Sequence, residues 1–188
     1  MRSICPVILG RAFASVFCAL ILTVCSFSQS TGKPSIAVLP FAESGTAQYG
    51  GTEVSDILIG ELLSSGKFEV ADKTKAAVEP DVLETIKDTI DAPTALEIGR
   101  RSGARYLIIG NLTEYVDKMK KSDFGMKSYE SFLKYTLRLV DSKTGDVLLT
   151  QTFKKSGVSV QADKSMQETL VKSAKEAATA LIKKLASS

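Results

Sequence analysis

The sequence predicts an α/β (α+β) fold in which helices flank a single mixed β-sheet. Two nearly continuous apolar runs, residues 35–41 and 106–110, are typical of strands buried on both faces. Residues 129–139 alternate between apolar and polar side chains, which is typical of a strand with one solvent-facing side. Residues 162–185 carry an apolar stripe at helical spacing and predict a long amphipathic C-terminal helix.

The elements follow from local signals in the order βαβααβββα. Pro40 has no N–H to donate, so it marks the last residue of the first strand or a bulge. Thr94 and Glu97 have the spacing of a capping box, which predicts a helix that begins at Thr94 and ends near Gly103. The remaining expectations are helices over 52–65 and 72–78, a short element over 81–90, strands over 68–71 and 147–153, and a strand from 106 to 116.

Residues 117–128 are rich in lysine and contain Gly125, so we expect a solvated hairpin connection there. The turn between the two last strands falls at residues 141–146. No repeat or low-complexity segment interrupts this order, and a chain of 188 residues is long enough for one domain with a sound core.

The first residues have the features of a secretory signal. Arg2 and Arg11 lie in a basic leader. Residues 12–24 follow as an unbroken run of apolar and small residues, which is shorter than a transmembrane helix requires. We therefore expect a signal peptide at 1–28, a tether at 29–33, and an exported α/β domain at 34–188.

Cys25 is open to two interpretations. Residues 22–25 (LTVC) resemble a lipobox, in which the cysteine is acylated and becomes the first mature residue, but Val24 stands where a smaller residue is usual. Ordinary cleavage after Ser28 is the alternative that we favour, because small residues also precede this point. Lipidation at Cys25 remains the one modification site that the sequence offers.

Charge and cysteine usage exclude several functions. Without Arg2 and Arg11, the 24 basic residues fall to 22 against 21 acidic ones, a net charge of about +1 that does not favour nucleic-acid binding. All three cysteines (5, 18 and 25) lie in the leader, so the expected mature chain forms no internal disulfide. Because the chain has no histidine, Ser-His and Cys-His catalytic pairs are excluded.

The clearest enzymatic pattern is the loop from Gly45 to Thr52. It matches the phosphate-binding P-loop except that Gly51 stands in place of the lysine, so an ordinary loop before a helix is the better interpretation. The carboxylate pairs Asp141 with Asp146, and Glu79 with Asp81, lie in turn-like segments. We therefore predict no catalytic, cofactor-binding or metal-binding residues, and no cofactor.

The order of several short motifs resembles the CsgG family. The resemblance covers roughly residues 35–152 and implies a periplasmic α/β domain without known catalysis. Its soluble fold is similar to that of the lipoprotein LpoB and of the TolB N-terminal domain. The motifs are residues 36–41 (IAVLPF), 55–58 (SDIL), 61–62 (EL), 65–68 (SGKF), 103–110 (GARYLIIG), 113–114 (TE), 139–141 (LVD) and 144–148 (TGDVL).

The family includes the curli secretion channel of the outer membrane. Members of the family that form channels carry two additional membrane hairpins. Here the corresponding places hold only the lysine-rich residues 117–128 and the short stretch 153–157, so we expect no transmembrane hairpin. The main hypothesis is a non-enzymatic periplasmic protein that binds another envelope protein or a second copy of itself. It would contact the outer membrane only through a lipid anchor on Cys25.

Two alternatives remain open. The first is a subunit or accessory factor of an outer-membrane secretion channel. The second is a small-ligand or nucleotide-binding enzyme that uses the loop from Gly45 to Thr52.

Overall fold

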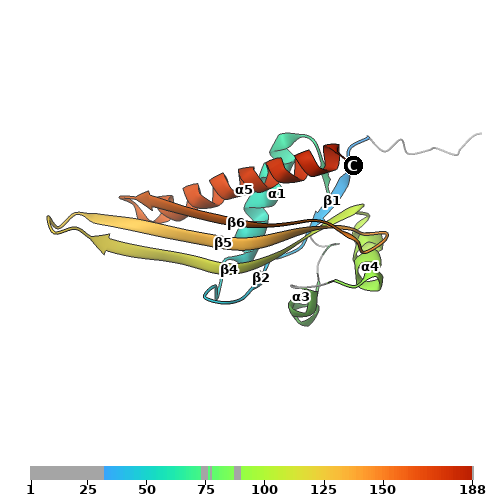
Figure 1. Cartoon of the computed structure of the whole chain (residues 1–188), viewed down its shortest axis with the longest axis horizontal. Coiled ribbons are helices and arrows are strands. Elements are labelled where there is room, and N and C mark those ends of the chain that lie inside the picture. Colours follow the sequence, from blue (N-terminus) through green and yellow to red (C-terminus); the bar gives the residue numbers. More distant parts are fainter. Residues whose placement is uncertain (1–31, 73–75, 77, 87–89, 188) are drawn as a thin grey trace, which may run out of the picture. The chain divides into compact units, whose positions relative to one another are not determined.

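The computed structural model of the chain describes residues 32–72, 76, 78–86 and 90–187, and its centre is a six-stranded mixed sheet (Figure 1). The strands, in spatial order, are β3 (Glu69–Val70), β1 (Ser35–Val38), β4 (Tyr106–Lys121), β5 (Lys127–Asp141) and β6 (Val147–Ser159), and β2 (Ala42–Glu43) also pairs with β4. Strand β1 pairs in parallel with β3 and β4, and β2 pairs in parallel with β4, whereas the pairs β4–β5 and β5–β6 are antiparallel. The predicted mixed sheet is confirmed.

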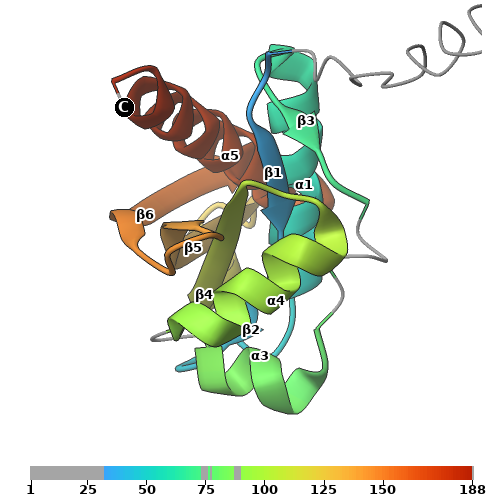
Figure 2. The same ribbon diagram turned by 90° about the vertical axis from the view of Figure 1, so that its right-hand side faces the viewer.

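Helices cover both faces of this sheet (Figure 2). Helices α1 (Gly51–Ser65) and α5 (Ala162–Ala186) lie on one face, and α3 (Pro80–Ile86) and α4 (Ala92–Ser102) lie on the other. Strand β1 is buried on both sides, because Ile36 and Val38 enter the first core while Ala37 and Leu39 enter the second. The predicted helix over 162–185 corresponds to α5 within one residue.

A register change separates β1 from β2. Val38 lies opposite Ile108 of β4 and Ala42 lies opposite Asn111, so four steps along one strand match three along the other. The extra residue falls beside Pro40, which agrees with the expected strand end or bulge. Because side chains alternate along a strand, the extra residue turns Phe41 toward the same core as Val38.

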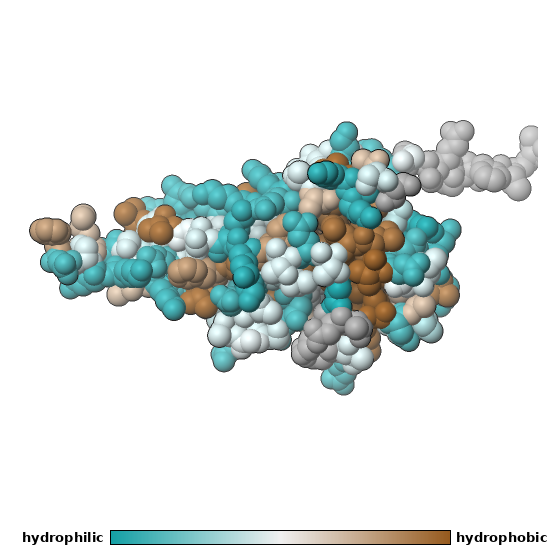
Figure 3. All heavy atoms as spheres, in the orientation of Figure 1, coloured by the Kyte–Doolittle hydropathy of each residue, from teal (hydrophilic) through white to brown (hydrophobic). Residues whose placement is uncertain are grey.

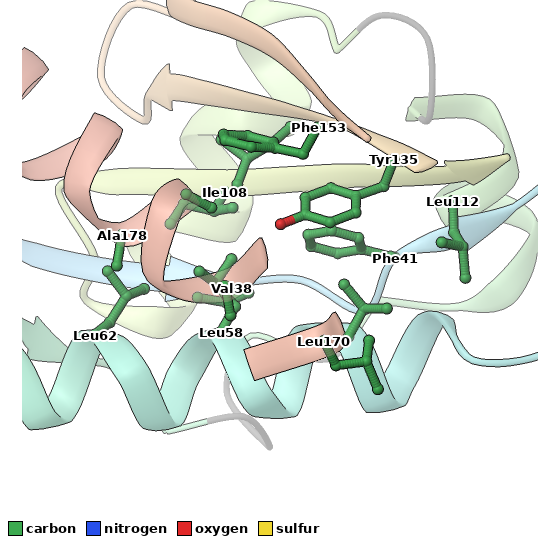
Figure 4. Packing of buried hydrophobic residues seen from close by; sticks show 14 of the residues in the cluster. Val38, Phe41, Leu58, Leu62, Ile108, Leu112, Tyr135, Phe153, Leu170 and Ala178 are labelled. Carbon is green, nitrogen blue, oxygen red and sulfur yellow. The ribbon is translucent and has the colours of Figure 1, made fainter. Parts of the chain in front are cut away.

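Phe41 begins a row of aromatic rings beneath α5 (Figure 4). Its ring centroid lies 5.5 Å from that of Tyr135, which in turn lies 5.2 Å from that of Phe153. Gly110 of β4 leaves the space that the Phe41 ring occupies, since a Cβ atom there would lie less than 3.0 Å from the ring. The Ser173 hydroxyl of α5 donates to the Tyr135 hydroxyl over 3.1 Å, and burial raises the pKa of Tyr135 to about 12.

The N-terminal half of α5 contacts the sheet through hydroxyl groups. Ser131 of β5 lies 2.7 Å from the Thr169 hydroxyl and accepts a hydrogen bond of 3.0 Å from Ser165, and all three residues are buried. Gly157 of β6 lets the helix approach, because a Cβ atom would collide with Thr169. Within the described residues, every buried side-chain nitrogen and oxygen has a hydrogen-bond partner.

Several predicted element boundaries were wrong. Helix α4 begins at Ala92 and is capped by Asp91, which accepts a hydrogen bond of 3.3 Å from the Thr94 N–H, so the predicted capping box at Thr94 is not the helix start. Pro80 opens helix α3, whereas the predicted short element began at residue 81. The predicted helix over 72–78 lies largely outside the described residues. Strand β2 was not predicted.

The lysine-rich segment was also misjudged in its extent. Strand β4 continues to Lys121 and β5 begins at Lys127, so only residues 122–126 form the connection. An antiparallel hairpin forms its ladder through the backbone, and lysines on both faces hide the period-two pattern by which strands are predicted.

Replacing Gly110 with alanine tests the packing of Phe41. We expect a loss of about 1–3 kcal/mol in the free energy of unfolding, because the added methyl group displaces the Phe41 ring. Urea denaturation measures the loss. Gly60→Ala is the matched control, since no atom lies within 4 Å of the added Cβ, and a helix-interior alanine should stabilise by about 0.5–1 kcal/mol. Equal stabilities of Gly110→Ala and the wild type would contradict the proposed packing.

Candidate interaction surface

In and beside the loop from Gly45 to Thr52, backbone N–H groups form hydrogen bonds within the chain. The Ser44 and Thr46 N–H groups donate to the Leu112 and Thr113 carbonyls of β4, over 2.9 and 3.1 Å. At the start of α1, the Gly51 N–H donates to the Glu43 carboxylate over 2.8 Å. This carboxylate lies where a P-loop would hold phosphate, so the geometry favours the loop interpretation given above.

Two tyrosines, Tyr49 of the loop and Tyr115 of β4, pack against each other. The Tyr115 hydroxyl donates to the Glu53 carboxylate over 2.5 Å, and burial, together with Glu53, raises the Tyr115 pKa. Tyr49 packs edge-on against Tyr115 with the ring centroids 5.3 Å apart, and its side chain is exposed. Gly50 adopts a left-handed conformation against the Tyr115 ring, which leaves no room for a side chain. These contacts make the loop a packed structural element.

Of the candidate carboxylate pairs, Asp141 and Asp146 flank the turn between β5 and β6, as expected, whereas Asp81 lies in a helix rather than a turn. Asp141 accepts from the Lys143 N–H over 2.8 Å and forms an ion pair of 2.6 Å with Arg105. Asp81 lies in the first turn of α3, where a negative charge favours the helix. In the described part of the chain, no group of three or more Asp, Glu, Cys or His residues is arranged to hold a metal ion.

Beyond the helices α3 and α4, strands β4, β5 and β6 continue as a three-stranded extension (Figure 1). One face of this extension packs on α5 through Ser131, Leu133 and Phe153. Among the described residues, no helix covers the opposite face at this end of the sheet. We call this opposite side the open face.

The open face combines apolar and charged side chains. Phe132 is 38% exposed and Val158 is 68% exposed, although both lie on strands. Lys134 forms an ion pair of 3.2 Å with Glu114, and Lys120 forms one of 2.7 Å with Glu130. A cleft of about 290 Å³ runs across it, lined mainly by Glu114, Phe132, Lys134, Lys154, Lys155 and Ser156. Such a mixture is typical of a surface that another molecule covers.

The hairpin between β4 and β5 ends in exposed apolar residues. Phe124 is 92% exposed and Met126 is 68% exposed, and hydrophobic spheres are visible at this end of the sheet in Figure 3. The sequence pattern predicts only a solvated connection over residues 117–128, and these exposed apolar side chains were not predicted. An isolated phenylalanine beside Gly125 and between lysines was the signal that would have identified them.

Cys25, residues 1–28 and most of the tether at 29–33 lie outside the described residues. No helix in the described ranges is both long and apolar enough to cross a bilayer.

Comparison with solved structures identifies proteins of similar fold. A dodecameric PelC variant from Paraburkholderia phytofirmans is 18% identical and has a TM-score of 0.50, covering 77% of this chain and 84% of its own. The lipoprotein GNA1162 from Neisseria meningitidis is 16% identical with a TM-score of 0.50, covering 82% and 99%. The LpoB C-terminal domain from Escherichia coli is 15% identical with a TM-score of 0.42, covering 67% and 84%.

No curated protein matches the sequence. The family model described as curli production assembly/transport component CsgG matches residues 11–186. This match includes both cores, the three long strands and α5. The chain therefore belongs to the CsgG family.

Proposed function

We propose that this chain is a non-enzymatic protein of the bacterial periplasm that acts by binding another envelope protein through the open face. The observation that carries the proposal is the exposure of Phe132 and Val158 on a face of the sheet that no described helix covers. Membership of the CsgG family supports a place in the cell envelope. The loop packing around Gly51 and Glu43 supports a role other than nucleotide chemistry.

The chemistry of the open face defines the kind of partner. Lys154 lies opposite Lys134, and Glu114 pairs with only one of these two lysines. A partner that offers an apolar side chain beside a carboxylate would fill the cleft next to Phe132 and pair with Lys154. The partner is either a different envelope protein, including a secretion-channel component, or a second copy of this chain. The dodecameric assembly of the similar PelC structure supports the second possibility.

We further propose the domain organisation expected from the sequence. Residues 1–28 serve as the export signal, 29–33 as a tether, and 34–188 as the folded domain. Attachment to the outer membrane through an acyl group on Cys25 is the alternative to simple cleavage after Ser28. Along residues 117–128 charged or polar side chains occupy both faces of the hairpin, so the chain acts without transmembrane hairpins of its own.

Site-specific photo-crosslinking in the native envelope tests the binding surface. A photoreactive residue in place of Phe132 should form a discrete crosslinked product, because this side chain faces the proposed partner. Leu63 on α1 is 55% exposed and provides the control position. Mass spectrometry identifies the partner as a second copy, a channel component or another envelope protein. Absence of a product at Phe132, or the same product at Leu63, would exclude the open face as the binding surface.

Labelling with radioactive palmitate tests the leader. If Val24 prevents lipobox processing, the mature chain should incorporate no palmitate, begin near Gln29 and leave the membrane without detergent. Edman sequencing of the mature protein gives the first residue. Incorporation that disappears in Cys25→Ala would show that the chain is instead a lipoprotein.

Thermal denaturation with magnesium ATP tests the nucleotide alternative. A ligand that binds only the folded state raises Tm progressively as its concentration exceeds Kd, and we expect no rise because Glu43 already occupies the start of α1. Sodium sulfate at the same ionic strength is the control for general salt effects. A rise in Tm that increases with ATP concentration and is absent with sulfate would restore the enzyme hypothesis.

A further inference from the structure

The end of the β4–β5 hairpin exposes apolar side chains next to several lysines. We call residues 118–128 the hairpin tip. Its apolar side chains Met119, Phe124 and Met126 are 57%, 92% and 68% exposed. Strand β6 ends opposite Tyr129, so the hairpin tip lies almost entirely beyond the third strand of the sheet (Figure 1).

Hydrogen bonds hold the turn in one conformation. The Ser122 N–H donates to the Met126 carbonyl, and the Gly125 N–H donates to the Ser122 carbonyl, each over 2.9 Å. Gly125 has a φ of +80°, a value that glycine adopts without strain. The Met126 N–H also donates to the Ser122 hydroxyl over 3.1 Å. The exposure of Phe124 is therefore a property of a closed turn.

The charges behind this turn are unbalanced. Lys121 lies directly opposite Lys127, and neither lysine forms an ion pair within the described residues. Like charges in directly opposite positions destabilise a hairpin. Asp123 is the only acidic residue from 118 to 128, against four lysines. The hairpin tip therefore has a positive surplus that would be neutralised by an anionic surface.

We propose that the hairpin tip docks peripherally into the headgroup region of a membrane that contains anionic lipids. Phe124 and Met126 would enter the boundary between headgroups and acyl chains. Lys118, Lys121 and Lys127 would contact the lipid phosphates, while Lys120 pairs with Glu130. This contact goes beyond the protein-binding role of the open face. It is also independent of an acyl group on Cys25.

The dimensions of the hairpin tip favour lipid over a protein partner. Two strands that lie about 4.8 Å apart present a narrow end, whereas a stable protein interface buries about 800 Å² on each partner. A lipid headgroup layer accepts single apolar side chains, and each lysine near an anionic surface adds about fivefold to the affinity. The lysines and the apolar residues thus favour the same occupant.

Tryptophan fluorescence provides a direct measurement, because the chain contains no tryptophan. Phe124→Trp is introduced into the chain as exported to a bacterial periplasm, with Cys25→Ala to remove any acyl group. With vesicles of phosphatidylcholine and phosphatidylglycerol in equal parts, we expect a blue shift and co-sedimentation. With phosphatidylcholine alone, we expect much weaker binding. Leu96→Trp on α4 is the control, because Leu96 is 52% exposed at the other end of the sheet and should show no shift.

Charge and side-chain variants complete the test. Lys121→Gln combined with Lys127→Gln should weaken binding to the anionic vesicles about 25-fold, at about fivefold for each lysine. The matched pair Lys143→Gln and Lys183→Gln, both exposed and outside the hairpin tip, should leave binding unchanged. Phe124→Ser should abolish co-sedimentation without altering the circular dichroism spectrum, since the side chain has almost no contacts to lose.

Three results would overturn the proposal. They are the absence of a blue shift for Phe124→Trp on anionic vesicles, an equal shift for Leu96→Trp, and equal binding by the two lysine double variants. The protein could instead fail to bind vesicles but form a crosslinked product in the envelope that is lost in Phe124→Ser. The hairpin tip would then bind a protein rather than lipid. The assignment of the open face would stand in each of these cases, because its own test uses Phe132.

Discussion

The fold depends on the packing of Phe41 over Gly110. The extra residue beside Pro40 turns Phe41 toward α5, and the missing side chain at Gly110 leaves the strand surface on which its ring rests. Tyr135 and Phe153 continue the ring contacts across β5 and β6. The short parallel strands and the long antiparallel strands therefore share one core, to which α1 and α5 both contribute.

Helix α5 changes the chemistry of its contacts along its length. Leu170, Ala177 and Leu181 are buried in the apolar core, whereas Ser165 and Thr169 reach the sheet through hydrogen bonds to Ser131. Apolar burial is roughly proportional to area and has little directionality, but hydrogen bonds require defined positions. The hydroxyl contacts thus fix the position of the extension relative to the body at a modest gain in stability.

The sequence predicts well those elements whose burial follows a simple period. Residues 129–139 and 162–185 have patterns set by their covered faces, and the structure places them as expected. Of the run 35–41, which is also largely buried, only Ser35–Val38 form a strand. Strand β2 could not be predicted, because two residues carry no period and its pairing with β4 depends on the register change at Pro40. Asp91 rather than Thr94 caps α4, since several suitable residues compete at a helix start and tertiary packing selects one.

The surfaces proposed for binding were the hardest part to predict. Phe132 belongs to an alternating strand whose covered face was correctly identified, but the sequence gives no sign that the other face lacks a helix. The extended hairpin through Lys121 and Lys127 forms its ladder through backbone groups, to which side-chain patterns are insensitive. In both cases the missing information is long-range pairing.

The extension also has a different dynamic character from the body. Between residues 120 and 128, the hairpin is held only by the β4–β5 ladder and the turn. Strand β6 does not pair with these residues, and α5 does not lie beside them. Amide hydrogens in such a segment exchange through local opening, at a free energy far below that of global unfolding. The hairpin can therefore bend as a unit, with its turn closed, while the aromatic core keeps its packing. Its amides and those of the core belong to separate cooperative units, and the surface that reaches farthest from the core adapts to its surroundings without a loss of native packing.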